Sequence, residues 1–347
     1  MPRKSNLMLV CLFPSLLLVG CSSFSKCNPP ERLDCESADL SGANLEGANL
    51  QGANLLGADL TGADLTGADL TSANLLDANL TDARLSGASL DGADLTNAIL
   101  EGANLEGVKW YDAILKGVNL NGANLTNAKL IRANLSGASL DGAIFEGASL
   151  EGASLEGVKW SDAILEGVIL NGANLKGANL FGANLFKASL IGANLFGANL
   201  NGAKLFGARL SGAQLGEADL IGADLPEADL TNARLSSAKL NGAALNGAKL
   251  NGADLSYADL NGADLNGADL SGANLKNAIL INAYLESADL RSAKLNYADL
   301  TGANLINANL TNAILISADL TNAILVGANL EGASLLFAIM PDGSFID

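Results

Sequence analysis

Large apolar residues recur at every fifth position over most of the chain. From Leu40 to Met340, every residue whose number is a multiple of five is Leu, apart from Trp110, Phe145, Trp160 and Met340. Two positions before each of these residues stands Ala, replaced only by Val108, Val118, Val158 and Val168. The pattern runs through 61 consecutive pentapeptides without an insertion or a deletion. Such strict spacing indicates one repeat architecture and not a set of ordinary globular domains.

A period of five fits neither an α-helix nor a flat strand. On a helix, successive leucines would step around the whole circumference and leave no apolar stripe. On a flat strand, an odd period would send alternate leucines to opposite faces. The chain must therefore turn within each pentapeptide so that every Leu points inward, and the Gly two positions after Leu suits such a corner because it tolerates a positive φ.

The repeat unit is Ala-(Asn/Asp)-Leu-X-Gly, as in residues 43–47, and this motif resembles the pentapeptide-repeat family over residues 38–340. The resemblance implies an all-β fold, a right-handed quadrilateral β-helix (solenoid) with four pentapeptides per coil. Sixty-one units then make about 15 coils, and a spacing of about 4.8 Å between stacked strands gives a rod roughly 70–75 Å long. Leu and Ala are expected to fill the interior, while the other three positions face outward.

The residue after X departs from Gly near the C-terminal end. Between residues 277 and 322 this position holds Asn, Ser or Tyr, with Gly only at Gly302. The sequence therefore predicts fewer glycine-type corners in this stretch and more type I or irregular ones.

The N-terminus has the features of a bacterial lipoprotein signal. Arg3 and Lys4 precede an apolar run over residues 7–19, which is too short to span a bilayer but suits a signal peptide. The run ends in residues 18–21, Leu-Val-Gly-Cys, which resemble a lipobox and imply cleavage before Cys21 and lipidation of that cysteine. The alternative is an ordinary secretory signal. We divide the chain into a signal peptide (1–20), a lipidated N-terminus and tether (21–34), the pentapeptide-repeat β-helix (35–340) and a C-terminal tail (341–347).

Two further cysteines remain after the expected cleavage. Cys27 and Cys35 are eight positions apart, and in an exported protein they could form a disulfide at the start of the solenoid. Because Cys35 falls in register with the core leucines, a buried free thiol is the alternative. Two cysteines in a chain without His leave the tetrahedral shell of a zinc ion half empty, so we expect no metal and no cofactor.

Charge limits the classes of partner. The formal net charge is −17, so nucleic acid and anionic lipid surfaces are expected to be repelled. Acidic side chains also keep a rod with many apolar residues soluble, and this plain explanation covers most of them. Charges of opposite sign also alternate at 20-residue intervals, as in Arg209, Asp229, Lys249 and Asp269.

Two groups of aromatic residues stand out from the repeat. Trp110 and Trp160 occupy Leu positions in nearly identical segments, 106–115 and 156–165, and are expected to overfill the interior and cause a local bulge. They are a possible recognition segment, although duplication of a tolerated variant is the better explanation. The second group follows core leucines directly and should face solvent, which makes it the first candidate for a partner contact: Phe181, Phe186, Phe196 and Phe206.

These features favour a non-catalytic protein. A convex rod filled with Leu, in a chain without His, offers no concave site where catalytic groups converge. We expect a lipid-anchored structural or protein-interaction module of the cell envelope, on the periplasmic or thylakoid-lumen face, with a protein or glycan partner. End-to-end association of two copies is a further possibility. The alternative is a DNA-mimicking, gyrase-binding protein, as some members of the family are, but the export signal, the interleaved charges and the lack of a C-terminal helical element argue against it.

Overall fold

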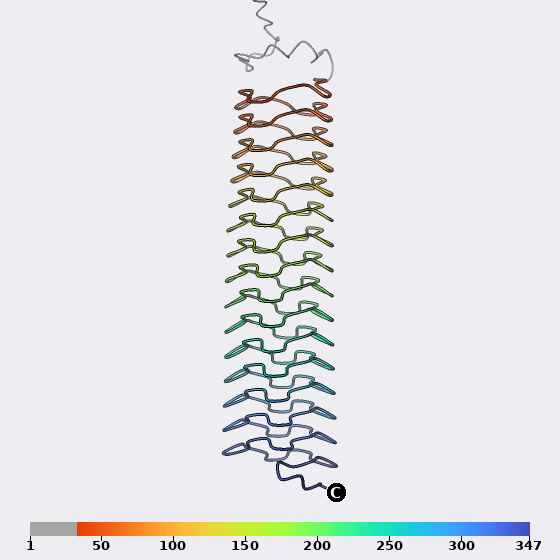
Figure 1. Ribbon diagram of the computed structural model, residues 1–347, viewed down its shortest axis with the longest axis vertical. Coiled ribbons are helices and arrows are strands. Elements are labelled where there is room, and N and C mark those ends of the chain that lie inside the picture. Colours follow the sequence, from red (N-terminus) through yellow and green to blue (C-terminus); the bar gives the residue numbers. More distant parts are fainter. Residues whose placement is uncertain (1–32) are drawn as a thin grey trace, which may run out of the picture.

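A computed structural model describes residues 33–347, which form a straight rod of stacked coils (Figure 1). The part of the chain that is described contains no helix, and its regular structure consists of single-residue β-bridges separated by turns. The expected signal peptide and most of the expected tether lie outside the described residues.

The bridges have one register along the whole rod. The residue before each core position pairs in parallel with the residue 20 positions later, from Asp34 with Asn54 to Asp319 with Ile339. Four pentapeptides therefore make one coil, as the resemblance implies. Residues whose numbers differ by 20 lie one above the other on the same face of the rod.

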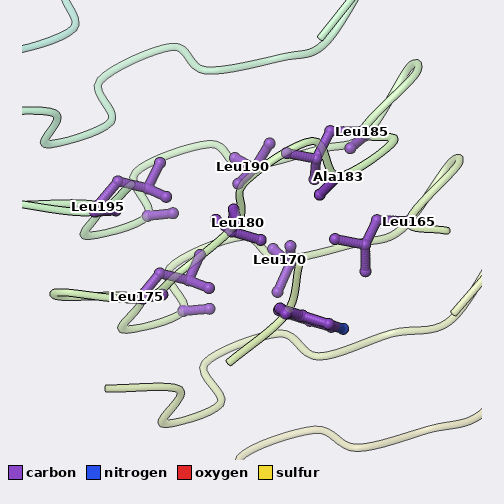
Figure 2. Packing of buried hydrophobic residues seen from close by; sticks show 14 of the residues in the cluster. Leu165, Leu170, Leu175, Leu180, Ala183, Leu185, Leu190 and Leu195 are labelled. Carbon is purple, nitrogen blue, oxygen red and sulfur yellow. The ribbon is translucent and has the colours of Figure 1, made fainter. Parts of the chain in front are cut away.

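Leucine and alanine fill the interior. The Leu positions and the Ala or Val positions are almost completely buried from Cys35 to Leu320, and the residues between them are half-buried or exposed, apart from the buried Ser189. Figure 2 shows leucines of successive coils, such as Leu165 and Leu185, pointing into the rod. Full burial of one Leu side chain stabilises the fold by about 1.5–3 kcal/mol, so the uniform column of leucines is the main source of stability.

Backbone hydrogen bonds join each coil to the next. The N–H of Leu100 donates to the carbonyl of Asn119 at 2.7 Å, and the N–H of Asn119 donates to the carbonyl of Ala98 at 3.0 Å. The same pair of bonds recurs along the rod, so most backbone groups of the convex surface are paired between neighbouring coils.

Every corner has the backbone geometry of a type II turn. The second central residue has a positive φ at each corner from Ser37 to Phe337, with values from 52° to 71°, and the first central residue does not. The predicted change between residues 277 and 322 is therefore wrong, since Asn277 has a φ of 57° and Ser317 the same value. Hydrogen bonds between coils hold the corner, as in the 3.0 Å bond from the Asn277 N–H to the Asn296 carbonyl, and they override the local preference of the residue.

Side chains before the core leucines stabilise the corners. The Oδ1 atom of Asp59 accepts the backbone N–H of Thr61 at 3.0 Å and the Thr61 hydroxyl at 2.6 Å. Such Asx-type bonds recur along the rod and explain why Asn and Asp dominate this position. Asn side chains also bond between coils, as from Asn74 Nδ2 to Asn54 Oδ1 at 3.1 Å.

The tail folds back on the last coil. Ile339 pairs antiparallel with Phe345, and the Ile346 N–H donates to the carbonyl of Ala338 at 3.0 Å. The rings of Phe337 and Phe345 lie 6.2 Å apart between centroids. The tail therefore covers the side of the coil that contains Ala338, which is buried, while Leu325, Leu330, Leu335 and Met340 are only partly buried.

Candidate functional site

The predicted Phe cluster, residues Phe181, Phe186, Phe196 and Phe206, lies on the surface of the rod. Each ring occupies the first central position of a corner, directly after a buried Leu, so its side chain points away from the core. Phe181 is 47% exposed and Phe196 40%, whereas Phe186 and Phe206 are half-buried. Exposed Phe side chains gathered on a polar protein are typical of contact surfaces.

Phe186 and Phe206 form a stacked pair. Their ring centroids are 5.6 Å apart and their planes are inclined by 14°. The ammonium group of Lys187 lies 4.8 Å from the centre of the Phe186 ring, within the range of a cation–π contact. Together with Asn184, Lys204 and their neighbours, the two rings line a shallow depression on this face.

One coil carries apolar side chains at all four of its corners. Phe181, Phe186, Ile191 and Phe196 occupy the corners of the coil formed by residues 181–200, and we call this set the apolar ring. Sequence reasoning missed Ile191, although comparing positions around one 20-residue coil would have found it. Phe181, Phe186 and Phe196 therefore lie on different faces of the rod at one level, and only Phe206 lies on the next coil, against Phe186.

The ring of Phe196 packs against Gly216 of the next coil. A Cβ atom placed on Gly216 would lie 3.2 Å from the Phe196 ring, so the ring lies against this glycine. Gly216 is at the first central position of its corner, where no positive φ is needed, and Glu217 takes the positive φ instead. In this repeat Gly stands directly after Leu, where other repeats have a larger residue, and the missing side chain leaves room for the Phe196 ring.

The tryptophan segments are buried in the core. Trp110 and Trp160 are 0% exposed, and neither indole Nε1 has a hydrogen-bond partner. The N–H of Ala or Val donates across every corner of residues 35–340 except the two that follow these tryptophans, where Ala113 and Ala163 lack this bond. The predicted bulge is thus a pair of opened corners, and the indole N–H does not find a carbonyl. A surface recognition role for these rings has no support from their position.

Trp160 and Trp110 differ in their surroundings. The ring of Phe145 meets Trp160 edge-on, with centroids 4.9 Å apart and planes 78° apart. Trp110 has no aromatic contact among residues 33–347. The two segments repeat in sequence, but only the tryptophan of the second has an aromatic core neighbour.

Charged side chains pair mainly between neighbouring coils. Arg132 donates to Asp112 at 2.6 Å, and hydrogen bonding from this guanidinium lowers the pKa of the Asp112 carboxyl. Burial raises the pKa of Asp229, but hydrogen bonds from Thr231 and Ser211 and the charge of Lys249 outweigh it and lower the value. The bridges of Asp229 with Arg209 and Lys249 place opposite charges on adjacent coils, as predicted.

Four carboxylates surround another coil. Asp141, Glu146, Glu151 and Glu156 occupy all corners of the coil formed by residues 141–160. Their outward direction spreads them over the faces of the rod. Among residues 33–347, no group of three or more His, Cys, Asp or Glu side chains is arranged to hold a metal ion.

Of the cysteines with a predicted role, only Cys35 lies among the described residues. Cys35 is 1% exposed, lies in the core column and is disulfide-bonded. Cys21 and Cys27 lie outside the described residues, so lipidation and the pairing of Cys27 with Cys35 stay predictions. No helix formed by residues 33–347 is long and apolar enough to cross a membrane.

Comparisons with known proteins agree with the repeat geometry. The profile of the family described as Pentapeptide repeats matches successive segments between residues 38 and 335. The chain belongs to the pentapeptide-repeat family. Among solved structures of the family, it is 34% identical to HetL from the cyanobacterium Nostoc sp. strain PCC 7120, involved in heterocyst differentiation regulation, over 78% of this chain and 92% of HetL, with a TM-score of 0.28.

Two other pentapeptide-repeat structures are similar over shorter stretches. Rfr23 from the cyanobacterium Cyanothece 51142 is 45% identical over 27% of this chain and 64% of its own, with a TM-score of 0.26. QnrB1, a plasmid-mediated fluoroquinolone resistance protein, is 21% identical over 50% of this chain and 89% of its own, with a TM-score of 0.36. No curated protein sequence matches the chain.

Proposed function

We propose that this pentapeptide-repeat protein is a non-catalytic, lipid-anchored rod that binds a protein partner in the bacterial cell envelope. The apolar ring is the observation that carries the proposal, because four apolar corners on one coil have no role in the core. On this proposal the fold is a right-handed quadrilateral helix of about 15 coils, and Cys21 carries the lipid that holds its N-terminal end at the membrane.

The shape of the rod suits contact and not catalysis. Catalytic groups act where side chains converge in a concave, partly dry site, whereas the side chains of each coil diverge from a packed core. A partner that grips the rod at the apolar ring would bury Phe181 and Phe196, and the stacked pair would extend the contact to the next coil.

The partner contact can be tested by photo-crosslinking in cells. A photoreactive phenylalanine analogue at Phe181 should capture a protein, and the capture should be lost when Phe186 and Phe206 are both replaced by Asn. The matched control places the analogue at Tyr284, which is 51% exposed and lies on a different coil. Equal capture from both positions, or capture that survives the double substitution, would contradict the proposal.

The anchor needs a separate experiment. Radiolabelled palmitate should be incorporated into the wild-type chain and lost in Cys21→Ser, while Cys11→Ser serves as the control within the signal. Equal labelling of the wild type and Cys21→Ser would remove the anchor from the proposal and leave the rod and its contact surface unaffected.

The alternative function is a DNA mimic that binds DNA gyrase. A mimic needs a continuous acidic surface, and this rod interrupts its acidic columns with Arg and Lys, as at Lys239 between Asp219 and Asp259. A supercoiling assay with purified gyrase distinguishes the two functions, because inhibition by the purified chain would favour the alternative.

A further inference from the structure

A second row of aromatic side chains lies along one edge of the rod. Tyr257, Tyr297 and Phe337 are separated by intervals of 40 residues, and each occupies the second central position of its corner. Their side chains are 59%, 57% and 48% exposed. Since one coil contains 20 residues, the three rings lie on the same edge at every second coil. We call this row the aromatic edge.

Hydrogen bonds show that these corners are stacked directly. The N–H of Tyr257 donates to the carbonyl of Lys276 at 3.0 Å, next to Asn277, and the N–H of Tyr297 donates to the carbonyl of Ile316 at 3.0 Å, next to Ser317. With about 4.8 Å between stacked strands, two coils separate neighbouring aromatic residues by about 9.6 Å along the rod.

The backbone disfavours aromatic residues at these positions. Tyr257 and Tyr297 each have a φ of 60°, and Phe337 has a φ of 59°, in a left-handed region that bulky side chains rarely adopt. Gly fills most corners of the rod, and these three residues are the only aromatic ones at positive φ in residues 33–347. An unfavourable conformation that recurs at a regular interval points to a function of the side chain.

The aromatic edge differs from the Phe cluster in two ways. Phe186 and Phe206 are one coil apart and their rings contact each other, whereas the rings of Tyr257, Tyr297 and Phe337 do not contact one another, and Phe337 contacts only Phe345 of the tail among residues 33–347. The corners between the aromatic ones carry Asn277 and Ser317, which are small and polar. From 237 to 337 the second central residue of every corner on this edge is uncharged, and the exposed Lys276 beside Asn277 is the one charged first central residue there.

We propose that the aromatic edge binds an extended β-1,4-linked glycan. One face of a pyranose ring presents C–H groups that pack on an aromatic side chain, and the opposite edges of the sugar carry hydroxyls that hydrogen-bond polar groups. In an extended β-1,4-linked chain, alternate sugars present the same face at an interval of one disaccharide, which is close to the two-coil spacing. The rings of Tyr257, Tyr297 and Phe337 would each stack on one such sugar, with Asn277 and Ser317 bonding the sugars between them.

The net negative charge of the rod favours a neutral polymer over an anionic one, because a neutral ligand is not repelled by the acidic surface. This site is separate from the apolar ring and does not depend on the lipid anchor, so it goes beyond the proposed function. Cellulose-type and chitin-type chains share the geometry, and the experiment distinguishes them.

The test measures binding of the full chain to soluble hexasaccharides by calorimetry. Cellohexaose and chitohexaose represent the two β-1,4-linked types, and maltohexaose, which is α-1,4-linked and curved, is the negative control. We expect binding to at least one of the β-1,4-linked chains and none to maltohexaose. Tyr257→Gly and Tyr297→Gly should each weaken it by about tenfold, the loss expected for one stacked ring. Both variants restore the residue that the corner prefers, so they are expected to fold.

Two further variants distinguish specific binding at the aromatic edge from non-specific binding to exposed aromatic side chains. Tyr284→Asn removes an exposed tyrosine from a different face and restores the common residue at its position, and it should bind like the wild type. The exchange Tyr297→Ser with Ser317→Tyr keeps the number of aromatic residues but breaks the two-coil spacing, and it should bind about tenfold more weakly. Absence of binding to both β-1,4-linked hexasaccharides, or wild-type affinity in the exchanged variant, would overturn the proposal.

Discussion

The rings of Phe186 and Phe206 stack with centroids 5.6 Å apart, although 20 residues separate them in sequence. Stacked aromatic pairs contribute about 0.5–1.5 kcal/mol beyond the area they bury. A double-mutant cycle with Phe186→Ala and Phe206→Ala should therefore show a coupling energy of about this size in thermal or denaturant unfolding. The same cycle on Phe181 and Phe206, which lie on different faces, is the control and should show additive effects.

Replacing the two tryptophans by leucine should have unequal effects. Each change removes a buried indole N–H without an acceptor, which costs about 1–3 kcal/mol, and lets the next corner close. Trp160→Leu also loses the edge-on contact with Phe145, so it should be about 0.5–1.5 kcal/mol less stable than Trp110→Leu. Equal unfolding free energies for the two variants would contradict the assigned role of Phe145.

A methyl group at a corner glycine should destabilise the rod through the backbone alone. Gly47 has a φ of 63°, and a Cβ placed on it meets no atom within 4 Å. Gly47→Ala should therefore cost about 1–2 kcal/mol, the penalty of a left-handed conformation with a Cβ. Glu46→Ala, at the adjacent exposed position, is the control and should leave the unfolding temperature nearly unchanged.

Stability should fall in acid as Asp carboxylates that accept hydrogen bonds from the following corner take up protons. A hydrogen bond from the Thr66 hydroxyl, together with the Thr66 N–H and the charge of Arg84, holds the pKa of Asp64 below its ordinary value. A carboxyl whose pKa is lower in the folded state stabilises the fold above the unfolded pKa of about 3.9. That contribution is lost as the pH falls through the folded value.

The Asp64 contribution can be isolated by substitution. Thr66→Val should reduce stability at neutral pH and make the loss between pH 5 and acid smaller than in the wild type. Thr126→Val removes a similar 2.7 Å hydroxyl bond, but to the uncharged Asn124. It should lower stability by the same amount at every pH, and a matching pH profile in both variants would argue against the role of Asp64.

The disulfide at Cys35 should stabilise the first coil. Mass spectrometry of non-reduced digests should recover a peptide that links Cys35 to Cys27. Closing so short a loop contributes about 2–3 kcal/mol in the chain-entropy estimate, so Cys27→Ser and Cys35→Ser should lower the unfolding temperature in the same way as a reducing agent. A Cys35 peptide linked to a cysteine other than Cys27 would contradict the predicted pairing.

Much of the architecture could be predicted from the spacing of Leu alone. Inward leucines, outward Phe side chains and corners two residues after Leu follow from a period of five, because no other backbone path brings Leu100 and Leu105 to the same interior. The number of sides was not accessible from this period, and the resemblance to the family supplied it.

The conformational preference of single residues did not predict the corners, because hydrogen bonds between stacked coils determine the backbone there. Ser292 and Asn312 suggested irregular corners, yet each takes the same positive φ as the glycines, since its N–H bonds a carbonyl of the next coil. The aromatic edge was missed for a related reason. Tyr257 and Tyr297 look isolated in sequence, and only the 20-residue coil shows that they share an edge with Phe337.

The constant 20-residue register determines both the distance and the relative direction between two surfaces on the rod. Insertion of one whole coil between the apolar ring and the aromatic edge would lengthen the distance between them by about 4.8 Å and leave their relative direction unchanged. Insertion of one pentapeptide would turn everything beyond it by a quarter of the circumference, because four pentapeptides complete a coil. Distance and direction between two binding surfaces can therefore be set independently in this fold, by the number of residues added.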